Sequence, residues 1–329
     1  NTGLNLNIKK FYDLKFNPIM VKLNYFNEFP KGVNYYLFSL FSVIKAISLR
    51  PDFFITRNLF TLFIFVLLKK KVIIELHHDF SNEGKFVKFL YKYLNILNSK
   101  NIIKIIAITG PVKEFLVKKL KVNKKKIQIV PSASSIKIKF SKLKAKKIYN
   151  IGYFGSLDKS KGSKFVMELS KIDKINNYFV FGGDRKHINY LRKNFPNKNL
   201  YLHEYVSYKN LKNHIKKMDV LVMPSNNKIL RSLGGIGNIA KYTSPLKLFD
   251  YLASGKLIIM SNLKVFNEII KNNKNCIVLD LVHNKWLVVI KKITKNIKRI
   301  NILKKNAFIL SKNYTYKKRA QQLLDGLIY

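Results

Sequence analysis

The feature that most constrains the fold of this chain is the alternation of short apolar, β-rich runs with longer stretches of helical periodicity. This alternation is typical of βαβ units, and hence of parallel sheets covered by helices. The predicted strands are 19–23, 53–56, 71–76, 102–108 and 127–130 in a first series, and 149–154, 178–181, 199–203, 220–223, 257–260 and 276–279 in a second. Two doubly wound α/β units in tandem follow, and the cleft between them is the natural ligand position.

The boundary between the two units is predicted within a lysine-rich segment. Residues 136–147 contain no glycine and show no clear period, which indicates a solvated linker. The pattern gives an N-terminal domain over 1–147 and a second domain over 148–310. A helix is expected over 4–16 ahead of the strand at 19–23, so we expect the sequence to lack the strand that normally precedes that helix.

The charge is strongly positive, with 63 Lys and Arg against 17 Asp and Glu, a net +46. It is spread over the whole chain, whereas a nucleic-acid-binding arm would concentrate it. Codon bias in an AT-rich genome explains a Lys, Asn and Ile excess; attraction to an anionic membrane or a diphosphate substrate is the other interpretation. With one cysteine, Cys276, an intrachain disulfide is excluded and a reducing, cytoplasmic setting is expected. We expect no signal peptide, and runs such as 62–68 are too short for the ~20 residues of a membrane span.

The strongest local motif is TSPLKLFDYLASGKLIIMSN, which begins at Thr243. Ser244 is a favourable N-cap, Pro245 a favourable first helical residue and Gly255 a favourable C-terminal stop. The free N–H groups at such a helix start suit a phosphate. Asp250 could accept hydrogen bonds from the vicinal hydroxyls of a ribose, although an ordinary capped helix with a solvated Asp explains the same residues.

Two glycine motifs follow predicted strands of the second series. In IGYFGSLDKSKGSKF, Gly155 ends a strand, and Lys161 and Gly162 precede a helix; glycine allows close approach of a ligand and the lysine suits a diphosphate. In VFGGD, Gly182 and Gly183 predict a tight turn.

Together these segments resemble the C-terminal domain of the family 4 retaining glycosyltransferases, which have the GT-B fold. The resemblance covers residues 149–329 and includes DVLVMPS, FNEII and NCIVL; over the first half RPDFFITRN, VIIELHHDF, IIAITGPVKEFL and KIQIVPSA follow the family order more loosely. It implies two Rossmann-like doubly wound domains facing across a cleft. The first would take the acceptor and the second the nucleotide sugar, and a final helix at 311–329 would cross back to the first domain.

The resemblance also implies the site. Lys161 would bind the donor diphosphate; the arginine that accompanies it in the family is Ser156 here, and the two Glu of the family's acidic motif fall on Tyr242 and Asp250. We expect Lys228, Arg231 or Lys241 to supply the missing charge, the alternative being a mobile basic loop. The donor-binding candidates are Gly155, Ser156, Lys161, Gly182, Gly183, Arg231, Thr243, Ser244, Pro245, Lys247 and Asp250.

On the first domain, ELHHDF places His77 and His78 directly after a strand. Neutral imidazole both donates and accepts hydrogen bonds, and the family's histidine at this position contacts the donor sugar. The catalytic candidates are therefore His77, His78 and Lys161; the spacing from Glu75 favours His77 without excluding His78.

The implied reaction is transfer of a hexose, with retention, from a nucleotide-diphosphate sugar to a hydroxyl of a glycan or lipid-linked acceptor, as in cell-surface polysaccharide or lipopolysaccharide synthesis. We expect no cofactor beyond the nucleotide sugar and no metal, because the sequence has no dense His, Asp and Cys cluster and no Asp-x-Asp. Apolar and basic segments at 35–49 and 59–71 are either membrane-surface helices at the inner face or ordinary packing helices. The alternatives are a catalytically degenerate GT-B partner subunit and a basic nucleic-acid-binding α/β protein.

Overall fold

The computed structural model describes residues 21, 23, 30–80, 83–231 and 237–327. These residues divide into two compact units, one up to Pro131 and one from Ser132 onward, called here the N-terminal and C-terminal units. The predicted helix over 4–16 and, apart from residues 21 and 23, the predicted strand over 19–23 lie outside the described residues.

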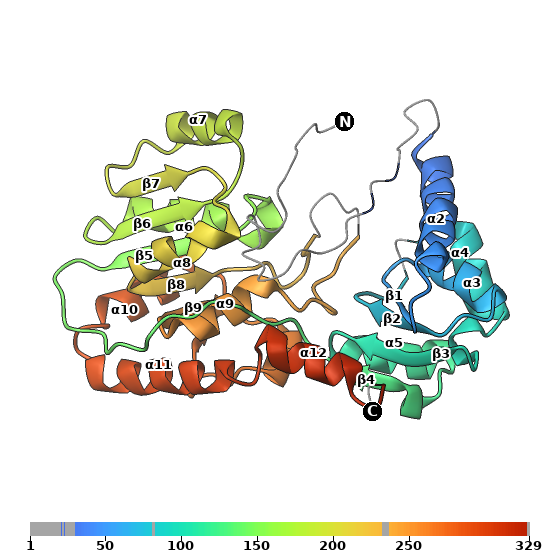
Figure 1. The fold of residues 1–329 in the computed structure, drawn as a ribbon. Helices are drawn as coiled ribbons and strands as arrows, with labels where there is room; N and C mark the ends of the chain where they lie inside the picture. The colour runs from blue at the N-terminus through green and yellow to red at the C-terminus, as the bar shows by residue number, and fades with distance from the viewer. Residues whose placement is uncertain (1–20, 22, 24–29, 81–82, 232–236, 328–329) are drawn as a thin grey trace. The chain divides into compact units, whose positions relative to one another are not determined.

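The N-terminal unit contains a four-stranded, all-parallel sheet (Figure 1). Its strands are β1 (Phe54–Thr56), β2 (Val72–Leu76), β3 (Ile102–Ala107) and β4 (Ile127–Ile129), in that order across the sheet; its helices are α2 (Lys31–Ser48), α3 (Leu59–Leu67), α4 (Lys85–Tyr93) and α5 (Gly110–Leu120). The consecutive residues Val72, Ile73 and Ile74 are all fully buried. Because successive strand residues point to opposite faces, both faces of this sheet are covered.

The C-terminal unit contains a six-stranded parallel sheet with the order β10-β9-β8-β5-β6-β7. Its strands are β5 (Asn150–Phe154), β6 (Asn177–Phe181), β7 (Leu200–His203), β8 (Val220–Met223), β9 (Leu257–Ser261) and β10 (Ile277–Leu279). Its helices are α6 (Ser163–Ile172), α7 (Arg185–Asn194), α8 (Tyr208–Lys216), α9 (Leu246–Ser254), α10 (His283–Lys291), α11 (Ile297–Ser311) and α12 (Tyr316–Leu324).

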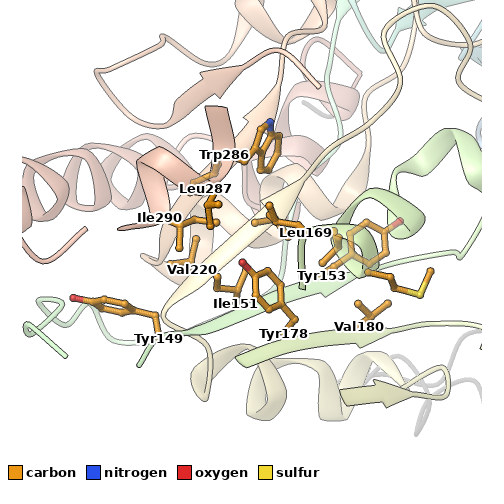
Figure 2. Packing of buried hydrophobic residues seen from close by; sticks show 14 of the residues in the cluster. Tyr149, Ile151, Tyr153, Leu169, Tyr178, Val180, Val220, Trp286, Leu287 and Ile290 are labelled. Carbon is orange, nitrogen blue, oxygen red and sulfur yellow. The ribbon is translucent and has the colours of Figure 1, made fainter. Parts of the chain in front are cut away.

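Two apolar layers cover this sheet. On one face Ile151 and Tyr153 pack with Leu169 of α6 and Trp286 of α10 (Figure 2). On the other face Phe154 belongs to a second cluster, formed with α8 and α9. The alternation along β5 therefore divides the core into two layers, as in a doubly wound fold.

The strands confirm the sequence prediction for every run that falls within the described residues, to within one residue at each end. The unit boundary does not lie at 147, and residues 136–147 are not a solvated linker. Leu143 is only 7% exposed and its N–H donates to Asn301 of α11, while Lys304 donates to the carbonyl of Ser141. These contacts hold the segment on the C-terminal unit, which begins at Ser132.

Helix α12 confirms a helix near the end of the chain. Its crossing to the first domain stays a prediction. Within the described part of the chain, no helix is both long enough and apolar enough to cross a bilayer.

Candidate functional site

The strand order of the C-terminal unit places a topological switch point at the carboxyl ends of β5 and β8, and the region between the loops that follow these strands is called the crevice here. From β5 the chain continues to β6 on one side and later returns as β8 on the other, so β5 and β8 are neighbours whose following loops diverge. Ligands of open α/β sheets bind at such a switch point. The predicted donor-binding residues follow β5, β6 and β8.

The loop after β5 is held in one conformation by glycines and by Tyr153. Gly155 has φ +146° and Gly162 φ +84°, and a Cβ on Gly162 would lie 1.9 Å from the carbonyl oxygen of Pro224, just after β8. The Tyr153 hydroxyl donates to the carbonyl of Ser156 at 2.8 Å and lies 3.3 Å from that of Lys161. Lys161 therefore stands at a fixed point of the crevice.

The FGGD turn supports this loop directly. A Cβ on Gly182 would lie 2.0 Å from the Gly155 carbonyl oxygen, and one on Gly183 would lie 2.7 Å from Leu157. The Gly155 N–H donates to the carbonyl of Phe181. The two glycine motifs, which the sequence left as separate turns, pack on each other.

Lys161 and Asp158 perturb each other's ionisation. Burial lowers the pKa of Lys161, and the Asp158 carboxylate opposes this shift. Hydrogen bonds from Ser160 lower the pKa of Asp158 most, with Lys161 and Arg231 contributing. A partly desolvated ammonium in a crevice interacts more strongly with a bound anion than one in water.

Helix α9 begins one residue later than predicted, and Ser244 does not cap it. Pro245 occupies the N-cap position, without a side-chain cap. The Ser244 hydroxyl accepts from the N–H of Ser132, and the Ser244 carbonyl accepts from the Ser132 hydroxyl. Thr243 is buried just before these contacts. The C-terminal stop is confirmed, since Gly255 has φ +63°.

Asp250 is enclosed by protein groups, being only 5% exposed. Its Oδ1 accepts from the hydroxyls of Ser134 at 2.6 Å and Tyr208 at 3.1 Å. Burial raises the pKa of Asp250 to about 6, while these two hydrogen bonds act in the opposite direction. Sequence reasoning missed Ser132, Ser134 and Tyr208, because nothing local in the sequence connects them with α9.

Lys247, in the first turn of α9, brings a second ammonium to the β5 loop. Its Nζ lies 4.4 Å from the Tyr153 ring centroid and 3.4 Å from the Tyr153 hydroxyl, and a Cβ on Gly155 would lie 3.4 Å from it. Burial, and secondly Lys161, lower the pKa of Lys247 to about 7. The sequence placed Lys247 among the donor-binding residues without assigning a role to its charge.

The loop after β8 brings Arg231 to the same place. The N–H of Arg231 donates to the Ser160 hydroxyl, and the N–H of Asn226 donates to the Ser160 carbonyl. Lys228 and Lys241 are exposed. Tyr242, which replaces the family's first Glu, is buried. Residues 232–236 lie outside the described residues, so the predicted closure of this loop stays a prediction.

In the N-terminal unit, His77 and His78 line a cavity of about 490 Å³ at the carboxyl ends of β1 and β2. His77 Nε2 lies 2.6 Å from Glu75 Oε1, and its Nδ1 lies 2.9 Å from Arg57 Nη2. Since arginine only donates, Nδ1 is the acceptor and Nε2 carries the proton that Glu75 accepts. The ring is thus fixed in one tautomer.

His78 has the less satisfied ring. Its Nε2 lies 3.9 Å from Glu83 Oε1, and among the described residues its buried Nδ1 has no hydrogen-bond partner. Burial raises the pKa of Glu83, against the effects of His78 and Lys88. His77 is oriented by its neighbours at both ring nitrogens, whereas His78 has one nitrogen that is buried without a partner among the described residues.

No group of three or more His, Cys, Asp or Glu side chains in the described part of the chain is placed to hold a metal ion. The charged groups gathered in the C-terminal crevice are the ammonium groups of Lys161 and Lys247, the guanidinium group of Arg231 and the carboxylate of Asp158. Such an arrangement can bind a phosphorylated ligand.

The profile of the family described as Glycosyl transferases group 1 matches residues 134–324. The chain belongs to this family. A comparison with curated proteins gave no significant match.

Solved structures with the same architecture support the GT-B fold. Sucrose-phosphate synthase from Thermosynechococcus elongatus superposes with a TM-score of 0.68 at 13% identity, over 92% of this chain and 81% of that one. A glycosyltransferase from Rickettsia africae superposes with a TM-score of 0.67 at 14% identity, over 93% of this chain and 83% of that one. HepE from Anabaena, in complex with UDP-glucose, superposes with a TM-score of 0.64 at 12% identity, over 87% of this chain and 81% of that one.

Proposed function

We propose that this glycosyltransferase moves a hexose from a nucleotide-diphosphate sugar to a hydroxyl of a glycan or lipid-linked acceptor, with retention at the anomeric carbon. The observation that carries the proposal is the meeting of Lys161, Lys247 and Gly155 at the β5–β8 switch point. The Anabaena structure with UDP-glucose bound supports a nucleotide-sugar donor. Synthesis of a cell-surface polysaccharide or lipopolysaccharide is the proposed setting.

The chemistry follows from the charges at the crevice. The difficult step is departure of the diphosphate from an oxocarbenium-like centre, and cations placed where that charge develops lower the barrier. Lys161 is proposed to hold the leaving group, with the first turn of α9 beside it. The departing phosphate is proposed to take the acceptor's proton, without a protein nucleophile or a metal ion.

The proposal assigns the sugar contact to the histidine pair of the N-terminal unit. Both ring nitrogens of His77 are bonded to Arg57 and Glu75, so His77 is proposed to shape the wall of the cavity. His78 lines the same cavity, and because its Nδ1 is buried, its Nε2 is the nitrogen proposed to reach the sugar.

The protein is proposed to bind at the inner face of an anionic membrane, where it would meet a lipid-linked acceptor. Helix α2 exposes the apolar side chains of Phe38, Phe41 and Ile44. It buries Val43 together with Asn34 and Ser39, so only part of its apolar surface is packed. Helix α4 exposes Phe86, Phe89 and Tyr93, with Lys85, Lys88 and Lys92 interleaved and exposed. Apolar side chains flanked by lysines favour an interface with anionic lipid.

The test is calorimetric titration of the full chain with UDP, GDP and ADP, followed by turnover with the sugar nucleotides of the class that binds. We expect one nucleotide class to bind, and proton NMR of the product to show the donor's anomeric configuration. Binding without turnover across a broad acceptor set would favour the degenerate partner subunit. Salt-sensitive binding of DNA with no nucleotide binding would favour the nucleic-acid alternative and overturn the proposal.

A further inference from the structure

The Lys247 ammonium has a neutral phenol and another cation among its neighbours. Among the described residues, no carboxylate forms an ion pair with its ammonium. Its closest polar contact is the Tyr153 hydroxyl, and burial raises the pKa of Tyr153 well above its ordinary value, so this phenol is neutral. A desolvated ammonium without a counter-charge is costly unless a ligand supplies the charge.

The ionisable groups around Lys247 act on one another in sequence. Lys161 is the charge that acts on Lys247, and Asp158 acts on Lys161. Arg231 in turn acts on Asp158. From α9 itself, Tyr251 acts electrostatically on Tyr153, and burial raises the pKa of Tyr251 too. Lys161, Lys247 and Arg231 are therefore linked through one set of interactions that includes the Asp158 carboxylate. The excess of positive charge in this set favours a ligand carrying more than one negative charge.

We propose that Lys247 is the second cation of the diphosphate site and supplies the charge that Ser156 does not. Its position on α9 places its ammonium at Gly155, where the absence of a Cβ leaves the backbone open to a ligand. This inference rests on the proposed function, because it specifies how the same site binds its donor.

A consequence is that donor binding takes up a proton. Burial and Lys161 lower the pKa of Lys247 to about 7, so above this pH the free side chain is largely neutral. A bound diphosphate favours the charged form and raises that pKa again. Above pH 7 donor affinity therefore falls as pH rises, and below pH 7 it is nearly constant.

The test is isothermal titration with the nucleotide diphosphate that binds the wild-type chain, at pH 6 and pH 8, in buffers of different ionisation enthalpy. For the wild type we expect uptake of about one proton at pH 8 and little at pH 6. Lys247→Met should weaken binding roughly 10- to 100-fold at pH 6 and abolish the proton uptake at pH 8. Lys247→Arg should restore affinity without proton uptake, since arginine stays charged.

Stability separates this role from a structural one. Without nucleotide, Lys247→Met should raise the melting temperature at pH 6, because it removes an unpaired charge; a purely structural ammonium over the Tyr153 ring would make the variant less stable. Lys291→Met on the exposed part of α10 is the matched control and should bind like the wild type. Equal affinity of wild type and Lys247→Met would overturn the inference, as would a loss confined to Arg231→Ala. If the wild type binds no nucleotide, the proposed function itself fails.

Discussion

Asp250 shows how one buried side chain makes stability depend on pH. Its carboxyl has a pKa of about 6 in the fold against an ordinary value of 3.8, because burial disfavours the charged form. The folded chain therefore binds more protons than the unfolded chain between these values. Asp250 contributes most favourably below about pH 3.8, and that contribution is lost as pH rises through 6.

Asp250→Asn should accordingly stabilise the protein above pH 6. Asparagine keeps an oxygen for the hydroxyls of Ser134 and Tyr208 but carries no charge. We expect a gain on the order of 2 kcal/mol at pH 8 and about a third of that gain at pH 4.5, measured by urea denaturation. Asp52→Asn, at an exposed position, is the control and should change little at either pH. A variant less stable than the wild type at pH 8 would contradict this account.

Gly182 is a second position where one atom decides the outcome. Its φ of +146° and a Cβ 2.0 Å from the Gly155 carbonyl oxygen leave no room for a side chain. Gly182→Ala should cost about 3 kcal/mol and displace the loop that carries Lys161, so nucleotide affinity should fall as well. Gly32, at the start of α2, has open space and is the control. Equal melting temperatures for Gly182→Ala and Gly32→Ala would refute the argument.

Among the elements, α4 offers the most direct test of the membrane proposal. Phe89 is 53% exposed on the helix face that also carries Lys85 and Lys92. Phe89→Glu should weaken binding to phosphatidylglycerol vesicles about tenfold or more, because it removes an inserting aromatic ring and adds repulsion. Co-sedimentation measures this, with Tyr190→Glu on α7, also exposed, as the matched aromatic control. The proposal loses its support if both variants sediment like the wild type.

The same elements show what the sequence could predict. The strands follow from run length and composition, so β8 was predicted to the residue and its neighbours nearly so. The sequence did not reveal that residues 136–147 pack on the C-terminal unit, although Ile136, Ile138 and Phe140 alternate with polar residues. Ile136 and Ile138 pack on the α9 side of the sheet. The ring centroids of Phe140 and Phe308 lie 5.6 Å apart. The high lysine content of this segment made it resemble a solvated linker, so the alternation was not recognised.

The site divides in the same way. Lys161 and the glycines sit in local motifs and could be found from spacing alone. The position of Lys247 over Tyr153 could not, because it joins residues 94 apart in the chain through the β5–β8 pairing. The contacts of Ser132 with Ser244 span 112 residues and have no local signal. Long-range packing fixed what spacing could not.

At the scale of the whole molecule, a net charge of +46 affects every binding assay. Any polyanion is attracted to such a chain at low ionic strength. Its affinity falls steeply with added salt, because the release of counterions on binding then contributes less free energy. A donor held in the desolvated crevice at Gly155 is screened much less. Salt therefore separates the specific site from the general field.

We expect the bound nucleotide diphosphate to keep most of its thermal stabilisation between 50 and 500 mM NaCl, whereas heparin should lose its effect. Over this range the Debye length falls from about 14 Å to about 4 Å. Lys161→Met should remove the nucleotide shift at both salt concentrations and leave the heparin effect at low salt unchanged, because one charge in 63 barely alters the field. Thermal unfolding with each ligand measures both. If the nucleotide shift faded with salt in parallel with that of heparin, the nucleotide would be bound by the surface charge and the crevice would not be the donor site.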